Sequence, residues 1–198
     1  MLQTLFAKYK PYYKENLILA LPIVGSQIGH MAVHMADSII VGQFAGTVQL
    51  AAVSLVNSLF MLVLVLGLGI SYGLTPLIAQ ANGRKDNNEC GRLLSNSLII
   101  NIITGIFLYC FIHFGTLAVI NNIGQSPEVV FHAKPYLAYL SLSILPLMIF
   151  QTFKQFAEGL NFTRQAMIIT LIADGINVFL TYGLINGEFG LPRLELKG

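Results

Sequence analysis

The longest stretch of this chain without a charged residue is 38–83, SIIVGQFAGTVQLAAVSLVNSLFMLVLVLGLGISYGLTPLIAQANG, and it decides the fold class. A membrane-spanning helix needs about 20 predominantly apolar residues, because the hydrocarbon core is about 30 Å thick and each residue rises about 1.5 Å. This stretch of 46 residues is too long for one span, and it breaks naturally at Gly42–Gly46. It predicts the end of one transmembrane helix, a short turn and a second helix.

The rest of the chain repeats this pattern. Residues 16–36, 93–127 and 135–153 carry no Asp, Glu, Lys or Arg, and Asp174 alone interrupts 165–187. Only 10% of all residues are charged, against about a quarter in soluble domains, so a soluble enzyme, a nucleic-acid module and a disordered tail are disfavoured. We expect an all-α polytopic membrane protein with five transmembrane helices, at 16–43, 50–80, 93–120, 130–157 and 164–186.

Basic residues predict the orientation. Cytoplasmic loops are enriched in Lys and Arg. One side of the predicted bundle holds Lys8, Lys10, Lys14, Arg84, Lys85, Arg92, Lys154 and Arg164, and the other holds Lys134, Arg193 and Lys197. Residues 1–15 are therefore expected to be a cytoplasmic segment. Residues 187–198 read as a loop leading to a further helix, which the chain lacks.

The first predicted helix carries His30, His34 and Asp37 at i, i+4 and i+7, on one stripe. Polar groups in lipid are costly, and they usually face a bundle interior or a water-filled cavity. A carboxylate near two imidazoles could exchange protons or hold a small cation. The alternative is an Asp that reaches water at the interface, with histidines that are merely hydrogen-bonded inside the bundle. No HExxH motif accompanies the histidines, so a metalloprotease is disfavoured.

The fifth predicted helix has a similar stripe, Thr170, Asp174, Asn177 and Thr181. These oxygens suit a hard cation such as Na⁺, and Asp174 could also carry a proton. The alternative is hydrogen bonding between helices without a role in transport. On the fourth helix the residues that could line a cavity are Tyr136, Tyr139 and Ser143, although a Tyr at a helix end is often an interface anchor.

Proline and glycine positions predict local geometry. Pro22, Pro76 and Pro146 lie inside predicted helices, where each removes a backbone hydrogen bond and favours a kink. Such kinks could be hinges of alternating access or static bends. The pairs Gly25/Gly29 and Gly69/Gly73 have the small-xxx-small spacing that permits close helix contact. Neither the two cysteines nor any nucleophile–base pair suggests a metal site or an enzyme.

A series of short motifs, in order over nearly the whole chain, resembles the multidrug and toxic compound extrusion (MATE) family, most of all its bacterial NorM-like group. The motifs are Leu21-Pro22, MADS at 35–38, VG at 41–42, LAAVSL at 50–55, YGLTPLIAQANG at 72–83, GR at 91–92, FAEGLNFTR at 156–164, Asn177 and NGEFGLP at 186–192.

The resemblance implies a twelve-helix fold of two lobes, of which this chain would supply helices one to five of the first and lack the C-terminal lobe. It implies an antiporter of the bacterial cytoplasmic membrane that exports drugs or organic cations, with no cofactor beyond the coupling ion, H⁺ or Na⁺. Asp37 matches the helix-one coupling carboxylate, Asn177 the asparagine of the same site, and Pro22 the proline at which helix one bends. Thr181 departs from the acidic residue or Asn of some relatives. The alternative is a lipid-linked glycan flippase of the same superfamily, which we expect to have a cationic cavity, whereas no Lys or Arg lies mid-span here.

Overall fold

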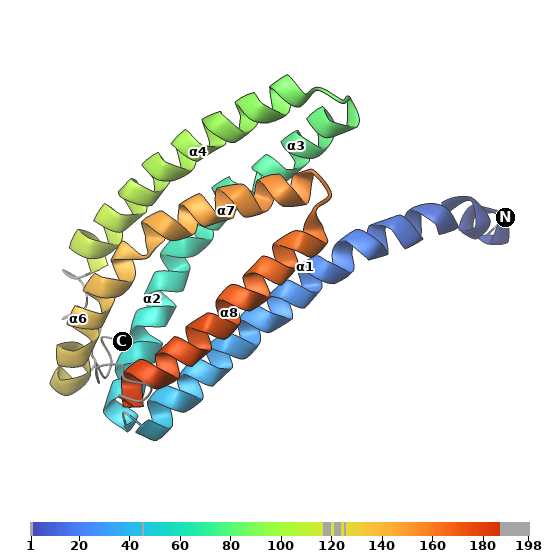
Figure 1. Ribbon diagram of the computed structural model, residues 1–198. Helices are drawn as coiled ribbons and strands as arrows, with labels where there is room; N and C mark the ends of the chain where they lie inside the picture. The colour runs from blue at the N-terminus through green and yellow to red at the C-terminus, as the bar shows by residue number, and fades with distance from the viewer. Residues whose placement is uncertain (1, 45, 117–119, 121–123, 125, 187–198) are drawn as a thin grey trace.

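The structure is a computed structural model that describes residues 2–44, 46–116, 120, 124 and 126–186 (Figure 1). These residues form helices joined by short turns, and none of them lies in a β-strand. The all-α prediction is confirmed, while the predicted loop 187–198 lies outside the described residues. In chain order the helices are α1 (Leu2–Phe44), α2 (Thr47–Tyr72), α3 (Leu74–Gly83), α4 (Asn87–Cys110), the π-helix η1 (Phe111–Thr116), α6 (Pro127–Leu142), α7 (Ile144–Gly159) and α8 (Thr163–Asn186).

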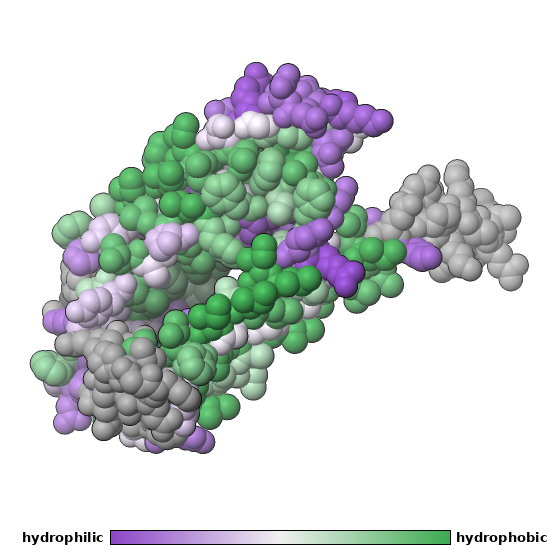
Figure 2. All heavy atoms as spheres, in the orientation of Figure 1, coloured by the Kyte–Doolittle hydropathy of each residue, from purple (hydrophilic) through white to green (hydrophobic). Residues whose placement is uncertain are grey.

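Five stretches match the five predicted spans, with shifted ends. Four of them are single stretches long and apolar enough to cross a membrane, namely Asn16–Gln43, Thr47–Gly83, Asn87–Gly115 and Thr163–Ile185. The fifth is α6 and α7 taken together, with a bend of 40° between them. Hydrophobic residues cover the helix surfaces, and hydrophilic residues gather at the α3–α4 turn (Figure 2). The helix of α1 also continues through the segment 2–15 that precedes its span.

Prolines explain where two spans are interrupted. A proline has no N–H to bond the carbonyl four residues earlier, and its ring crowds that carbonyl. For Pro76 that carbonyl belongs to Tyr72, the last residue of α2, and for Pro146 it belongs to Leu142, the last residue of α6. The kinks predicted at Pro76 and Pro146 are therefore observed as helix breaks.

Each break is a single residue in a tighter turn. The Gly73 N–H donates to the carbonyl of Ile70 at 3.3 Å, and the Ser143 N–H donates to that of Leu140 at 3.1 Å. These bonds reach back three residues, one fewer than in an α-helix. By contrast, α1 continues as a helix through Pro22, so the bend expected there stays a prediction.

Close contacts between α2, α4 and α7 lie at Gly67. A Cβ added at this position would lie 2.7 Å from Leu108 Cδ1 and 2.9 Å from Met148 Sδ, whereas one at Gly69 would meet nothing within 4 Å. At Gly73 the nearest atom is the carbonyl oxygen of Ile70, in the preceding helix. The close approach predicted at Gly69 and Gly73 is therefore wrong, because the face of α2 that meets α4 and α7 is the one that carries Gly67.

A buried chain of hydrogen bonds joins the same three helices. Ser71 Oγ donates to Asn101 Oδ1 at 2.9 Å, and Asn101 Nδ2 donates to Thr152 Oγ1 at 2.8 Å. One turn away, Thr75 Oγ1 of α3 donates to Gln155 Oε1 of α7 at 2.6 Å. No sequence motif predicted these residues as partners, although the polar Asn101 inside an apolar helix was an available signal. The bonds hold α2 and α3 against their neighbours on both sides of the break at Gly73.

Candidate functional site

The helices α1 and α8 lie side by side (Figure 1), and glycines let them approach closely. A Cβ at Gly25 would lie 3.1 Å from Met167 Sδ, and one at Gly29 would overlap the side chain of Leu171. The close contact predicted for Gly25 and Gly29 is confirmed.

Gly25 lies near Met167, Gly29 near Leu171, and Val41 in one cluster with Ile185. Residue numbers therefore rise in the same direction along both helices, so α1 and α8 are parallel. Near the far end of the pair, Val41 of α1 and Ile185 of α8 share a buried cluster with Val53 of α2. With the helices in step, the predicted polar stripe of α1 faces that of α8. We call this face the α1–α8 seam; its polar residues are His30, His34, Asp37, Asp174, Asn177 and Thr181.

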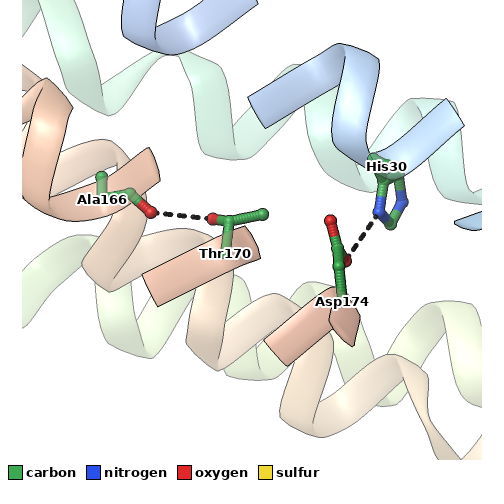
Figure 3. Close-up of polar contacts among 4 residues, drawn as sticks. All are labelled: His30, Ala166, Thr170 and Asp174. Atoms are coloured by element: carbon green, nitrogen blue, oxygen red, sulfur yellow. Dashed lines mark hydrogen bonds and ion pairs between the residues drawn. The ribbon is translucent and has the colours of Figure 1, made fainter. Parts of the chain in front are cut away.

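One polar contact across the seam joins His30 and Asp174 (Figure 3). His30 Nδ1 lies 3.4 Å from Asp174 Oδ1, and the imidazole is 53% exposed while the Asp174 side chain is only 14% exposed. The second carboxylate oxygen, Asp174 Oδ2, is buried and has no hydrogen-bond partner among the described residues. The ring of His34 meets that of His30 edge-on, with centroids 4.9 Å apart. The imidazole pair predicted beside Asp37 therefore directs one ring to Asp174.

Asp37 has a different set of neighbours. Its carboxylate has a side-chain hydrogen bond with Thr181 of α8, and His34 and His30 act on it electrostatically. Asp37 Oδ1 is buried and unpaired in the part of the chain that the structure describes. The half-buried phenol of Tyr136, on α6, is close enough to Asp37 to interact with it electrostatically. A carboxylate with a free oxygen, next to a hydroxyl, can accept a proton or a small cation.

The remaining predicted residues divide between the seam and other surfaces. Asn177 is exposed and lies between Asp174 and Thr181 on α8. Thr170 is buried, and its Oγ1 donates its proton to the carbonyl of Ala166 in its own helix at 2.9 Å (Figure 3). Tyr139 lies on an exposed face of α6, 60% exposed, so Tyr136 is the tyrosine that the structure brings toward Asp37. Ser143 forms the α6–α7 break.

The two carboxylates belong to separate parts of the seam. Asp37 pairs with Thr181, seven residues beyond Asp174 on α8, which corresponds to about 10 Å along the helix. Since the helices are parallel, their side chains tilt toward the same end and do not shorten this separation. A bound cation has ligand distances of about 2–2.6 Å. One ion therefore cannot contact both carboxylates in this arrangement.

The spacing of His30 and His34 raised the question of a transition-metal site. Among the described residues, no three His, Cys, Asp or Glu side chains come together in a group that could hold a metal ion. The seam instead offers carboxylate, amide and hydroxyl oxygens, which are the donors that suit hard cations.

Comparison with known proteins places this arrangement in a family. The MatE family model matches residues 22–183. The "Probable multidrug resistance protein NorM" of Agrobacterium fabrum is 29% identical over 94% of this chain and 40% of its own length. The protein of the same name from Oceanobacillus iheyensis is 32% identical over 97% of this chain and 42% of its own length.

A solved structure has a similar fold. It is described as the "outward-facing conformation of a multidrug resistance MATE family transporter of the MOP superfamily", and it matches with a TM-score of 0.80 and 23% identity. The match covers 88% of this chain and 39% of that one. The chain thus spans about 40% of the length of the curated relatives it matches. Its family model, its relatives and its helical arrangement agree, and the chain belongs to the MatE family.

Proposed function

We propose that this chain is the first-lobe part of a cation-coupled antiporter, which exports drugs or organic cations across the bacterial cytoplasmic membrane by alternating access. Its family and the multidrug resistance names of its relatives support the transport class. The shares of about 40% that it covers in those relatives support a second lobe elsewhere in the full gene product.

The observation that carries the coupling role is the environment of Asp37. This carboxylate lies at the seam between two parallel spans, bonded to Thr181 and with Oδ1 buried and unpaired among the described residues. A proton or Na⁺ at this position satisfies that oxygen, and the exposed amide of Asn177 is one turn from Thr181 to assist it. The bound ion neutralises the carboxylate, which makes it a weaker acceptor for the hydroxyl of Thr181 and changes how α1 is held against α8.

The ion can drive transport only if it binds the two conformations of the protein unequally. A contact between helices meets this requirement, since a relative shift of α1 and α8 separates Asp37 from Thr181 and alters the affinity for the ion. In this scheme the ion binds from the outside and is released to the inside. The organic cation binds from the inside and is released to the outside.

Orientation with the N-terminus in the cytoplasm is part of the proposal. The start of α1, the α3–α4 turn and the α7–α8 turn lie at the same end of the molecule (Figure 1). These segments contain most of the Lys and Arg residues, among them Arg84, Lys85 and Arg164. Positive residues favour the cytoplasmic side, which supports this end as the inner one.

The test is dye efflux from cells that express the full gene product. Asp37→Asn keeps the size of the side chain and removes its charge, so we expect efflux of ethidium to fall at least tenfold, to the level of cells without the transporter. Asp86→Asn is the matched control, because Asp86 caps the exposed end of α4 and Asn is an equally good cap. Efflux that is unchanged in Asp37→Asn would remove this residue from the mechanism.

A further inference from the structure

We propose that Asp174 is a second proton-carrying site, separate from the site at Asp37, and that His30 positions it; this inference rests on the cation-coupled transport proposed above. The transporter would then carry two coupling ions in each cycle, one at each carboxylate.

The two carboxylates lie apart along the seam. Asp37 has Thr181 as its partner, and Asp174 has His30, about 10 Å away along the seam. Each carboxylate has one buried oxygen without a hydrogen-bond partner among the described residues. A buried carboxylate oxygen that stays charged and unpaired is unfavourable, so a proton or cation bound at either group stabilises it there.

The neighbours of Asp174 on the Gly29 side bear on which ion it takes. Asp174 Oδ2 lies 3.7 Å from where a Cβ at Gly29 would stand, and the side chain of Leu171 comes close to that same point. Na⁺ needs several oxygen ligands, and neither Gly29 nor Leu171 has a side-chain oxygen to supply. A proton needs a single oxygen and no coordination shell, so on this side of Asp174 a proton is favoured over a metal cation.

His30 holds Asp174 from the neighbouring helix. Its Nδ1 faces Oδ1 of Asp174, while the imidazole is half-exposed. The imidazole thus fixes one carboxylate oxygen and leaves Oδ2 to accept the proton. The ring of His34 packs edge-on against that of His30, which helps to hold the imidazole in place. In this arrangement His30 is a positioning residue, and the proton resides on Asp174.

Few other charged groups face this position. The span of α1, which forms one side of the seam, and the neighbouring span of α2 contain no Lys, Arg or Glu. Lys154 and Glu158 of α7 lie by the α7–α8 turn, and Asp174 follows the start of α8 at Thr163 by eleven residues, about 16 Å. The titratable groups of the seam and its neighbours are therefore His30, His34, Asp37, Asp174, Tyr182 and, from α6, Tyr136.

The cycle balances in protons. In the outward-open state one proton from outside binds Asp174 Oδ2 and a second ion binds Asp37, and no other bond is made or broken. In the inward-open state both ions leave to the cytoplasm. The cargo cation moves in the opposite direction, so each turnover returns both carboxylates to their starting state and, with a monovalent cargo, moves one net positive charge inward.

The first experiment counts protons without transport. The purified full gene product is mixed with tetraphenylphosphonium in weakly buffered detergent solution, and a pH dye records the protons released per protein in Na⁺-free solution. We expect two for the wild type, one for Asp174→Asn, one for Asp37→Asn and two for the control Asp86→Asn. Equal release by the wild type and Asp174→Asn would overturn the second site.

Infrared spectroscopy supplies a readout that needs no cargo. A protonated carboxyl group has its own C=O stretching band, so the wild type should show one such band that Asp174→Asn lacks and Asp37→Asn keeps. His30→Gln should shift this band without removing it, because the positioning contact is lost while the carboxyl stays. Absence of any band assignable to Asp174, over the whole pH range in which the protein is folded, would also overturn the proposal.

A transport measurement separates this inference from the proposed function. In proteoliposomes with a pH gradient of one unit, each coupled proton raises the limiting cargo accumulation about tenfold. Asp174→Asn should therefore accumulate about tenfold less than the wild type at steady state. It should remain coupled because it keeps the Asp37–Thr181 contact, through which the ion changes how α1 is held against α8; Asp37→Asn lacks this contact and should not transport, although it still binds a proton at Asp174. Coupled transport with unchanged accumulation would refute the second site alone, whereas no coupled transport by the wild type would refute the antiporter itself.

Discussion

Individual residues show how far a sequence pattern can specify a site. The spacing of His30, His34 and Asp37 correctly placed them on one face of α1. A spacing within one helix carries no information about the register of another, so it could not reveal that His30 meets Asp174 while Asp37 meets Thr181. The sequence thus supplied the members of the seam, and the packing of α1 on α8 divided them into two groups.

Whether a glycine lies at a close contact also depends on helix packing and not on spacing alone. This allows a test of stability at the residue scale. A Cβ at Gly159 would lie 2.7 Å from Ile78 Cβ and 2.9 Å from the backbone carbonyl oxygen of Thr75, neither of which can move easily. We expect Gly159→Ala to destabilise the full gene product by about 1–3 kcal/mol, seen as a lower thermal unfolding temperature in detergent.

Gly69→Ala is the matched control, because a Cβ there would meet nothing within 4 Å. Alanine also favours a helix over glycine by about 1 kcal/mol, so this variant should be as stable as the wild type or more so. If both variants unfold at the same temperature, the tight contact of α7 with α3 is not present in the folded protein.

At the scale of helices, local patterns predicted the elements well. The predicted helices needed only apolar length, and two of the three proline kinks appeared as breaks three residues before Pro76 and Pro146. The hydrogen bonds around Asn101 could not be located this way, since their partners come from helices 30 and 51 residues away in sequence. The Asn101 bonds hold α2, and the Thr75–Gln155 bond holds α3, on either side of Gly73, which favours a static bend over a hinge at this break.

We call the buried hydrogen bonds of Ser71, Asn101 and Thr152 the polar clamp. Removing them should lower the stability of the protein measurably. Asn101→Leu removes two bonds between helices, although Ser71 and Thr152 keep their bonds to carbonyls of their own helices. Bonds of this kind contribute about 0.6–2 kcal/mol in membranes, so we expect a modest fall in unfolding temperature.

Ser58→Ala provides the comparison, because this exposed hydroxyl bonds only to the carbonyl of Ser54 in α2. It should leave the unfolding temperature unchanged. An Asn101→Leu protein as stable as Ser58→Ala would show that the clamp does not stabilise the α2–α4–α7 group.

At the scale of the whole molecule, the helices form a parallel pair, α1 with α8, beside a group of α2, α3, α4, α6 and α7 (Figure 1). The polar clamp lies in the group, and the unpaired carboxylate oxygens lie in the pair. In the proposed mechanism the ion would act on the contact between these two helices rather than on a packed core. Low charge content predicted a membrane protein, but it could not predict this division, which depends on contacts between distant segments.

The most direct test of the central claim is cargo accumulation by the full gene product in proteoliposomes, with inward H⁺ and Na⁺ gradients imposed separately. Asp37→Asn and Asp86→Asn are measured beside the wild type. We predict that one or both gradients drive tetraphenylphosphonium against its concentration gradient in the wild type and in Asp86→Asn, and that neither does so in Asp37→Asn. Accumulation by Asp37→Asn equal to that of the wild type, under the same gradient, would contradict the account.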